Sequence, residues 1–234
     1  MRILLAGASS GVGRALATEL IARGHQVAAL GRTEPDFQAE QYLKTDTADS
    51  ASVIQIQSWL ASTGFAPDCV IQCAGLLHDQ DHMPEKRLSQ ISTDWIDKSM
   101  QVNLHTHIHL AQAINPLVRK SVPVKWVSLS ALVGSISENE LGGWYSYRMS
   151  KAALNMFIRN LDIEWRRKSP SSIVVALHPG TTTTQLSGPF QGNVAAGKLY
   201  TPELTATRLA GVIENLTAQQ SGRLLHWDGA PVPF

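Results

Sequence analysis

Tyr147 and Lys151 stand four residues apart, and their side chains could together carry out acid–base chemistry. Residues at this spacing lie on one face of a helix, and the residues that follow favour a helix that continues to about Arg167. An ammonium group close to a phenol favours the phenolate, so it lowers a pKa that starts at about 10. Such a phenol can exchange a proton with an alcohol or carbonyl oxygen near neutral pH. Tyr145 lies on a different face from Lys151, so the spacing selects Tyr147; because the same spacing also occurs on solvated helices, the neighbouring elements decide what the pair means.

A glycine-rich turn follows the first apolar run of the chain. Ile3–Ala6 suits a buried parallel strand, and Arg14–Arg23 has the apolar spacing of a helix. Glycines between a strand and a helix let the backbone approach a pyrophosphate, while the helix N-terminus offers N–H groups and the positive end of its dipole. The alternative is an ordinary strand-to-helix turn. We predict a dinucleotide-binding turn made of Gly7, Ser9, Ser10, Gly11, Val12 and Gly13.

The end of the second predicted strand, Gln26–Leu30, indicates which dinucleotide is bound. Folds that bind NAD usually place an acidic side chain there to hold the ribose hydroxyls. Here Gly31 and Arg32 follow the strand, and no acid occurs before Glu34. A guanidinium group suits a 2′-phosphate, so we favour NADP(H) over NAD(H). The alternative for Arg32 is a solvated surface arginine.

Strands and helices alternate along the rest of the chain. This order predicts the α/β class, with a single Rossmann-like, doubly wound parallel sheet of about seven strands, helices on both faces and one domain over residues 1–234. The carboxyl ends of the strands then gather along one edge, where a ligand can bind. Further strands are expected at Gln41–Thr45, Asp68–Gln72, Val124–Leu129, Ile173–Leu177 and Arg223–His226, and further helices at Ser50–Ser62, Ser92–Ile114 and Pro202–Leu216.

Two segments lack a regular pattern. Residues 185–200 carry glycines, a proline and little periodicity, which suits a mobile lid over the substrate. Gly229–Phe234 reads as a proline-containing tail.

Composition narrows the classes of protein. The chain has 234 residues, 44% of them hydrophobic and 17% charged, with a formal net charge of +1, so it gives no argument for binding nucleic acid or an anionic membrane. No apolar run approaches the roughly 20 residues of a membrane span, and no signal segment is seen. Cys69 and Cys73 form neither a disulfide framework nor a zinc motif, so we expect a cytoplasmic protein. His105, His107 and His109 are expected to be surface or packed histidines, and no metal site is expected.

Taken together, these motifs resemble the short-chain dehydrogenase/reductase family of the classical type. They occur in the family's order and roughly its spacing over nearly the whole chain. Within the family, three motifs resemble the C-factor-like proteins and the carbonyl reductases similar to sniffer. They are Gly134-Ser135-Ile136, Tyr147-Arg148-x-Ser150-Lys151-Ala152-Ala153-Leu154-Asn155 and His178-Pro179-Gly180. The motifs that resemble the family as a whole are Gly7-x-x-x-Gly11-x-Gly13, Ala74-Gly75, Asn103, the serine-ended strand before Ser130, Tyr147-x-x-x-Lys151 and Pro179-Gly180.

The resemblance implies a role for individual residues. Tyr147 matches the general acid/base, and Lys151 matches the residue that lowers the tyrosine pKa and holds the nicotinamide ribose. Asn103 matches the helix residue that anchors a water in a proton relay. The expected cofactor contacts beyond the glycine turn and Arg32 are Asp46 at the adenine with its neighbour Thr47, Cys73, Ala74 and Gly75 beside the adenosine ribose, Pro179 and Gly180 after the sixth strand, and Thr182 and Thr184 at the nicotinamide carboxamide.

Three residues depart from the family pattern. Ala6 replaces the usual threonine before Gly7, and Cys73 replaces the usual asparagine before Ala74. The catalytic serine of related reductases lies three residues before the glycine that matches Gly134, and that position is Ala131 here. Either the backbone brings Ser130 into the site, or Tyr147 alone stabilises the oxyanion. We favour Ser130, since Ser128 lies deeper in the strand.

The resemblance implies an oxidoreductase that interconverts a carbonyl and an alcohol with NADP(H), with Tyr147, Lys151, Ser130 and Asn103 as catalytic residues. A small-molecule carbonyl or alcohol would be its substrate, and family members commonly form dimers or tetramers. The alternative is a nucleotide-binding signalling or regulatory protein, for which the resemblance to C-factor speaks. Such proteins often lose the tyrosine or the lysine, and this chain keeps both.

Overall fold

The computed structural model describes residues 1–234 except for the side chain of Asn193, and its centre is an eight-stranded sheet. The strand order is β10-β9-β6-β5-β4-β1-β2-β3, and every neighbouring pair is parallel except β9–β10. The parallel strands therefore end at one common edge. The strands are β1 (Arg2–Ala6), β2 (Gln26–Gly31), β3 (Gln41–Lys44), β4 (Cys69–Gln72), β5 (Lys125–Leu129), β6 (Ile173–Leu177), β9 (Leu224–Leu225) and β10 (Pro231–Val232).

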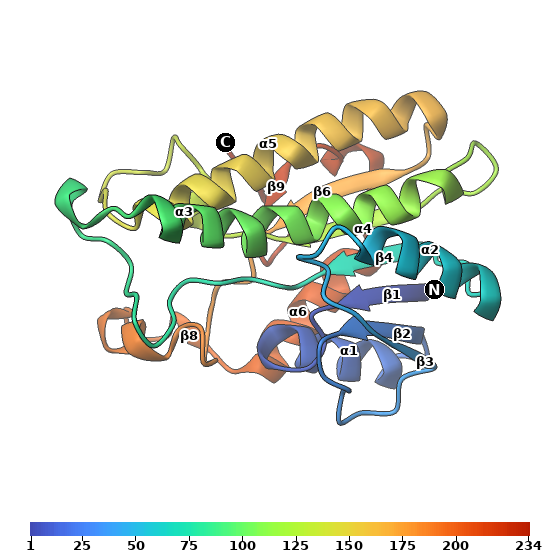
Figure 1. The fold of residues 1–234 in the computed structure, drawn as a ribbon, viewed down its shortest axis with the longest axis horizontal. Helices are drawn as coiled ribbons and strands as arrows, with labels where there is room; N and C mark the ends of the chain where they lie inside the picture. Colours follow the sequence, from blue (N-terminus) through green and yellow to red (C-terminus); the bar gives the residue numbers. More distant parts are fainter.

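Helices cover both faces of the sheet. Figure 1 shows α1 and α6 on one face, and α2, the α3–α4 segment and α5 on the other. A π-helical turn, Gln101–His105, joins α3 to α4 into one long helical segment. Among the described residues, no helix combines the length and the apolar composition that crossing a membrane requires. The helices are α1 (Gly11–Ala22), α2 (Ser52–Thr63), α3 (Thr93–Met100), α4 (Thr106–Ile114), α5 (Tyr145–Lys168) and α6 (Pro202–Glu214).

The first strand shows why the sheet is apolar on both faces. Side chains alternate between the two faces of a strand. Ile3 and Leu5 pack in a cluster with side chains of α1 and α6, whereas Leu4 packs on the opposite face with side chains of α2, α4 and α5. All three side chains are completely buried. A strand covered on both sides needs a continuous apolar run rather than alternation with polar residues, as the sequence indicates.

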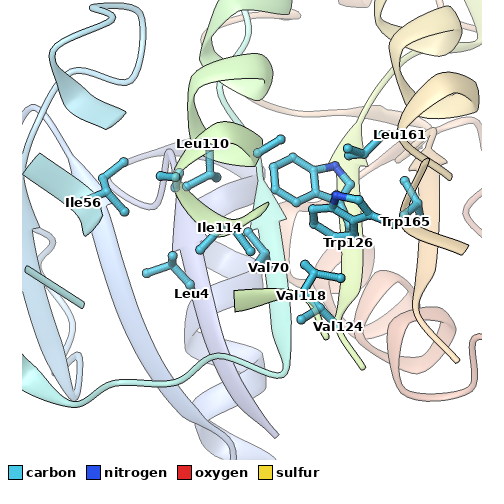
Figure 2. Close-up of a cluster of buried hydrophobic side chains, with 14 of the residues drawn as sticks. Leu4, Ile56, Val70, Leu110, Ile114, Val118, Val124, Trp126, Leu161 and Trp165 are labelled. Atoms are coloured by element: carbon cyan, nitrogen blue, oxygen red, sulfur yellow. The ribbon is translucent and has the colours of Figure 1, made fainter. Parts of the chain in front are cut away.

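A pair of tryptophans fixes α5 on the sheet. Trp126 on β5 and Trp165 on α5 meet edge to face, with ring centroids 5.8 Å apart (Figure 2). Each buried indole N–H has an acceptor: Trp126 donates to Ser128 Oγ at 2.9 Å, and Trp165 donates to Asn115 Oδ1 at 3.1 Å. The helix that carries Tyr147 is thereby held by apolar contact and by satisfied hydrogen bonds.

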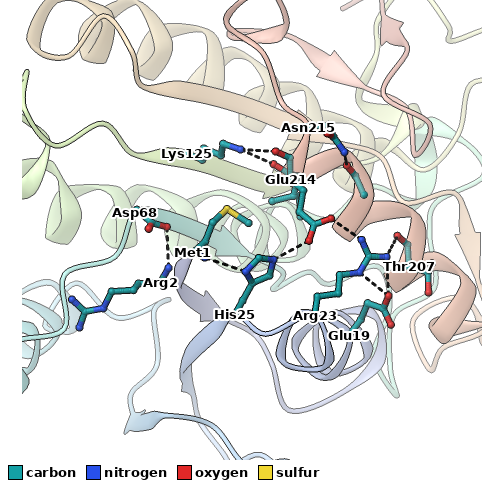
Figure 3. A network of polar contacts seen from close by, with 12 residues as sticks. Met1, Arg2, Glu19, Arg23, His25, Asp68, Lys125, Thr207, Glu214 and Asn215 are labelled. Atoms are coloured by element: carbon teal, nitrogen blue, oxygen red, sulfur yellow. Dashed lines mark hydrogen bonds and ion pairs between the residues drawn. The ribbon is translucent and has the colours of Figure 1, made fainter.

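A polar network closes the opposite end of the sheet, where the parallel strands begin (Figure 3). Glu214, the last residue of α6, accepts hydrogen bonds from Arg23 at 2.7 Å and pairs with His25 at 2.9 Å. Lys125 at the start of β5 donates to the carbonyl oxygens of Ile213 and Glu214, at 3.1 and 2.9 Å. A cation at these carbonyls is favourable because they form the negative end of the helix dipole. This network ties α6 to the strands at the end remote from Tyr147.

The predicted α/β fold with a parallel, doubly covered sheet is confirmed, with two differences in detail. We predicted about seven strands and a tail at Gly229–Phe234, but Pro231–Val232 in that tail pairs antiparallel with β9 as an eighth strand. Proline is tolerated there because β10 is an edge strand.

The 185–200 segment contains regular structure, and it pairs with the residues just before it. β7 (Thr181–Thr182) and β8 (Leu199–Tyr200) pair as a separate two-stranded parallel sheet, and a 3₁₀ turn occupies Gly188–Asn193. Figure 1 places this segment at the end of the molecule towards which β1 points.

Candidate active site

The first turns of α5 present Tyr147 and Lys151 at the carboxyl edge of the sheet. Tyr147 is 8% exposed, and its hydroxyl has no hydrogen-bond partner among the described residues. Lys151 is 3% exposed, and its Nζ donates to the carbonyl oxygen of Leu129, the last residue of β5, at 3.0 Å. The Nζ also lies 5.8 Å from the centre of the Tyr147 ring. The two groups are therefore neighbours, as their spacing predicts.

Burial opposes the predicted lowering of the Tyr147 pKa by Lys151. Burial raises the pKa of Tyr147 above its usual value, and Lys151 does not counter this shift. The reason is that the ammonium group lies over the ring and bonds to Leu129 rather than to the phenol oxygen. Burial also lowers the pKa of Lys151 to about 8, so the ammonium form itself is disfavoured here.

Asn103 lies in the π-helical turn between α3 and α4 and is completely buried. Its Oδ1 accepts a hydrogen bond from the N–H of Leu76 at 2.7 Å, and its Nδ2 donates to Leu76 O at 2.8 Å and to Ser150 Oγ at 3.0 Å. A Cβ atom on Gly75 would lie 3.5 Å from Asn103 Oδ1 and 3.7 Å from Lys151 Nζ. Asn103, Gly75 and Lys151 thus converge on one place, and a π-bulge at such a position is typical of functional sites.

The glycine turn packs directly against the end of β4. A Cβ atom on Gly7 would lie 2.8 Å from the N–H nitrogen of Ala74, and one on Gly13 would overlap the Gly7 carbonyl oxygen. Only glycine fits at either position. Ser9 and Ser10 are exposed, and Ser10, the N-cap residue of α1, makes no side-chain cap hydrogen bond in the described structure. The first N–H groups of α1 are therefore available to an anion.

The side chain of Gln72 holds the turn at Cys73–Gly75 through hydrogen bonds. Its Oε1 accepts from the Ala74 N–H at 3.0 Å, and its Nε2 donates to the Thr106 carbonyl oxygen at 3.1 Å and to Thr47 Oγ1 at 3.4 Å. The backbone of this turn is thus held by the residue that precedes Cys73. Burial raises the pKa of the Cys73 thiol to about 12, which leaves it protonated at neutral pH.

Of the three histidines, His105 is exposed, His109 is half-buried and His107 is buried, which matches the expectation of surface or packed side chains. His105 and His109 share a face, with ring centroids 6.1 Å apart, and His109 pairs with the Thr47 carbonyl oxygen. His107 points the other way, is completely buried, and contacts Ser128 Oγ through Nδ1 at 2.8 Å. Burial, together with the charge of Lys151, holds the pKa of His107 well below its usual value.

Ser130 and Ala131 point in different directions at the end of β5. Ser130 donates to Asn155 Oδ1 at 2.8 Å, and Asn155 in turn donates to the Gly134 carbonyl oxygen at 3.0 Å. Ala131 instead packs in an apolar cluster with Tyr147 and Leu77. The residue in the family's serine register is therefore the one beside the phenol, and it carries no hydroxyl group.

The predicted cofactor residues on the other strand ends differ in their exposure and in the hydrogen bonds that they already make. Arg32 and Asp46 are exposed at the ends of β2 and β3. Thr182 is buried, and its hydroxyl pairs with Thr205 Oγ1 at 2.8 Å, whereas Thr184 contacts Ser187. A Cβ atom on Gly11 would lie 3.4 Å from Thr184 Cγ2, so the segment after β6 lies beside the glycine turn.

Pro179 and Gly180 form the turn between β6 and this segment. A Cβ atom on Gly180 would lie 3.0 Å from the Tyr200 ring and 3.1 Å from the Trp227 ring. Gly180 has a φ of +79°, which also favours glycine. The turn therefore packs against the end of the 185–200 segment.

An apolar wall surrounds the Tyr147 ring. Trp144 meets Tyr147 edge to face with ring centroids 6.3 Å apart, and Phe190 lies 5.0 Å from Trp144. Leu186 and Val133 pack against the same cluster. The 185–200 segment thus contributes side chains next to the phenol, and it is further held by His78, which contacts the Gln185 carbonyl oxygen at 3.2 Å.

Four buried polar residues near the site were not assigned a role from the sequence: Gln72, Glu85, His107 and Asn155. Gln72 and His107 are polar residues within buried elements, which is a usable signal for a hydrogen-bonding role. Asn155 belongs to the motif that resembles the family. Glu85 lies in a polar loop with no periodic pattern, and nothing in the sequence marks it as buried.

The family model for short chain dehydrogenases matches residues 1–194, and the chain therefore belongs to the short-chain dehydrogenase family. The chain is 30% identical over 239 residues to 1-hydroxy-2-glutathionyl-2-methyl-3-butene dehydrogenase from a Rhodococcus species, an alignment that covers 97% of this chain and 96% of that one. It is also 31% identical over 137 residues to the C-signal of Myxococcus xanthus, covering 58% of this chain and 77% of that protein.

Solved structures share the fold over the full length. The carbonyl reductase Sniffer of D. melanogaster superposes with a TM-score of 0.84 at 21% identity, covering 100% of this chain and 99% of that chain. An NADPH-bound carbonyl reductase from chicken fatty liver has a TM-score of 0.83 at 23% identity, with coverage of 100% and 98%. The predicted membership of the short-chain dehydrogenase/reductase family is thereby confirmed by the family model, and the solved structures show that the fold is shared with carbonyl reductases.

The buried Lys151 predicts a pH-dependent stability. Its pKa is about 8 in the folded protein and 10.5 in an ordinary setting, so between these values the unfolded chain binds more protons and stability rises with pH. Lys151→Met should therefore stabilise the ligand-free protein near pH 7, by up to roughly 3 kcal/mol, and the gain should shrink towards pH 10. Urea denaturation at several pH values measures it, with the exposed Lys120→Met as the control. A difference that does not change with pH would contradict this prediction.

Proposed function

We propose that this protein is an NADP(H)-dependent oxidoreductase that interconverts a carbonyl and an alcohol, with Tyr147 as the general acid/base. The single observation that carries this proposal is the position of the Tyr147 hydroxyl. It has no partner among the described residues, it lies beside Lys151, and both stand at the edge where the glycine turn meets the end of β4. The carbonyl reductases and the dehydrogenase that resemble the chain support the same reaction class.

The residues present fit a dinucleotide. The exposed, uncapped start of α1 can accept a pyrophosphate, and Gly7 and Gly13 leave no side chain between the turn and Ala74. Arg32 at the end of β2 can hold a 2′-phosphate, which favours NADP(H) as the cofactor. When bound, the reduced cofactor supplies the hydride. The NADPH-bound carbonyl reductase that shares the fold is consistent with this choice.

The chain's own residues would handle the proton. Tyr147 would donate its phenolic proton to the oxygen of the substrate carbonyl as charge develops there. Lys151, with a pKa of about 8, still carries its proton at neutral pH and can stabilise the resulting phenolate. Asn103 lies beside Lys151 and Gly75, where it can hold a water that resupplies the proton. The wall of Trp144 and Phe190 would exclude bulk water from the phenol.

For the oxyanion, the geometry favours the second of the two alternatives, in which Tyr147 alone holds the oxygen. The Ser130 hydroxyl is already donated to Asn155, and Ala131 occupies the position beside the phenol. Ser130 would have to leave a buried hydrogen bond to take the catalytic role.

The signalling alternative rests on the partial similarity to the C-signal. A protein that binds NADPH but reduces none of a broad panel of aldehydes, ketones and quinones would support it over the enzyme. Two further features stay predictions. One is assembly into a dimer or tetramer, and the other is a role of residues 185–200 as a lid over the substrate.

Tyr147→Phe is expected to lower the turnover number by about 10²–10⁴-fold, because it removes the proton donor and little else. NADPH binding should be retained, which fluorescence titration measures alongside NADPH absorbance decay. Tyr145→Phe, on the adjacent face of the same helix, is the matched control and should keep its activity. Normal turnover by the Tyr147 variant would remove this residue from the mechanism.

Ser130→Ala is expected to leave kcat/KM within about fivefold of the parent. Its cost should fall on stability, by about 1–2 kcal/mol, because Asn155 loses a donor in a buried setting. Steady-state kinetics and urea denaturation on the same preparation separate these effects. If turnover instead falls by about a hundredfold or more, Ser130 is assigned to the oxyanion.

Arg32→Ala is expected to weaken NADPH binding by about 10- to 100-fold and to leave NADH binding unchanged, since only NADPH carries the 2′-phosphate. Isothermal titration with each cofactor tests this, with the remote, exposed Arg167→Ala as the control. Equal losses for the two cofactors would show that Arg32 does not recognise the phosphate.

A further inference from the structure

Glu85 is a buried carboxylate that the proposed chemistry does not use. It lies in the loop between β4 and α3 and is 3% exposed. Its carboxylate accepts hydrogen bonds from the N–H of Ser146, at 3.2 and 3.4 Å to the two oxygens, and from the Ser146 hydroxyl. These donors belong to the first turn of α5, where unpaired N–H groups and the positive end of the helix dipole favour an anion.

The backbone carbonyl group of Glu85 contacts the backbone of Trp144. The Trp144 N–H donates to the Glu85 carbonyl oxygen at 2.5 Å. Trp144 has a φ of +52°, the one positive value at a non-glycine residue in the described chain. Gly142 and Gly143 precede it with φ of +64° each, and a Cβ atom on Gly143 would lie 3.2 Å from Glu85 O. A bulky residue in the left-handed region persists only where its surroundings impose it, and such residues gather at functional sites.

The imposed conformation sets where the indole lies. As the N-cap residue of α5, Trp144 stands three residues before Tyr147, and its ring meets the Tyr147 ring edge to face. It also lies against Phe190 of the 185–200 segment. An ordinary N-cap conformation is extended, so a Trp144 with such a backbone would direct its side chain elsewhere. The wall beside the phenol therefore depends on the clamp that Glu85 forms with both Trp144 and Ser146.

We propose that Glu85 is a positioning residue for substrate recognition, which holds Trp144 as the aromatic wall that a carbonyl substrate contacts next to Tyr147. This inference rests on the proposed function, because it concerns the substrate of that reaction. The competing explanation is that Glu85 only caps α5. A cap would contribute to stability alone, whereas a positioning residue also changes the KM for the carbonyl.

The kinetic test compares Glu85→Gln with Asp162→Asn at saturating NADPH. Asp162 is a matched control: it is a buried carboxylate on the same helix, it accepts a hydrogen bond from Ser221 at 2.6 Å, and it lies 15 residues or about 22 Å beyond Tyr147. Glutamine removes the negative charge and can keep only one of the two oxygens, so an NH2 donor replaces one of the acceptors that face the Ser146 N–H. The KM for the carbonyl should rise about tenfold in Glu85→Gln, with kcat and NADPH affinity within about twofold, and should not rise in Asp162→Asn.

A double variant tests whether Glu85 acts through Trp144. Adding Glu85→Gln to Trp144→Ala should raise the KM no further, because the wall is already gone. Additive effects of the two substitutions, an unchanged KM in Glu85→Gln, or equal KM changes in Glu85→Gln and Asp162→Asn would overturn the proposal.

A spectroscopic readout keeps the inference separate from turnover. The fluorescence of Trp144 is obtained as the difference between a protein and its Trp144→Ala variant, since the chain has six tryptophans. In Glu85→Gln this difference signal should be quenched by acrylamide at least about twofold more strongly than in the parent. If the parent reduces no carbonyl, the proposed function fails while this signal still tests the clamp; an unchanged quenching constant shows that Glu85 does not hold Trp144.

Discussion

The close approach of the glycine turn to the end of β4 is the constraint on which the site depends. β1 pairs with β4 in parallel, so the residues that follow both strands emerge side by side. At that point the Gly7 backbone meets Ala74, and Gly13 meets the Gly7 carbonyl, with no space for a Cβ atom. The same strand end leads to Gly75, Asn103 and Lys151. A shift of β1 against β4 would therefore separate the phosphate-binding turn from the acid–base pair.

Much of this arrangement is encoded locally and could be predicted. The apolar runs set the strands, the alternation of strands with helices sets the parallel sheet, and the four-residue spacing places Tyr147 and Lys151 on one helical face. Pro231–Val232 escaped prediction because two residues carry no periodicity, and they become a strand only by pairing with β9. Boundaries of this kind depend on tertiary contacts rather than on local preference.

The chemistry of the side chains was harder to predict than their positions. Proximity of an amine to a phenol predicted a lowered Tyr147 pKa, but burial dominates and raises it. Ser130 is close to the site in sequence, yet its hydroxyl turns to Asn155. Glu85 is buried although it comes from a polar loop, because its partner Ser146 lies on a helix 61 residues later in the chain. In each case the outcome depends on desolvation and on the choice of hydrogen-bond partner, which spacing alone does not specify.

His107 shows how a titratable group can be buried near the site without becoming charged. The imidazole is completely buried, faces Ser128, and is disfavoured from protonation both by desolvation and by the ammonium of Lys151. The indole N–H of Trp126 can only donate, so the Ser128 oxygen accepts a hydrogen bond from it. The Ser128 hydroxyl can then donate a hydrogen bond to His107 Nδ1. Burial and the neighbouring ammonium group therefore keep the imidazole uncharged across the physiological pH range. Among the described residues buried next to the start of α5, the positive charge is thus confined to the amine of Lys151.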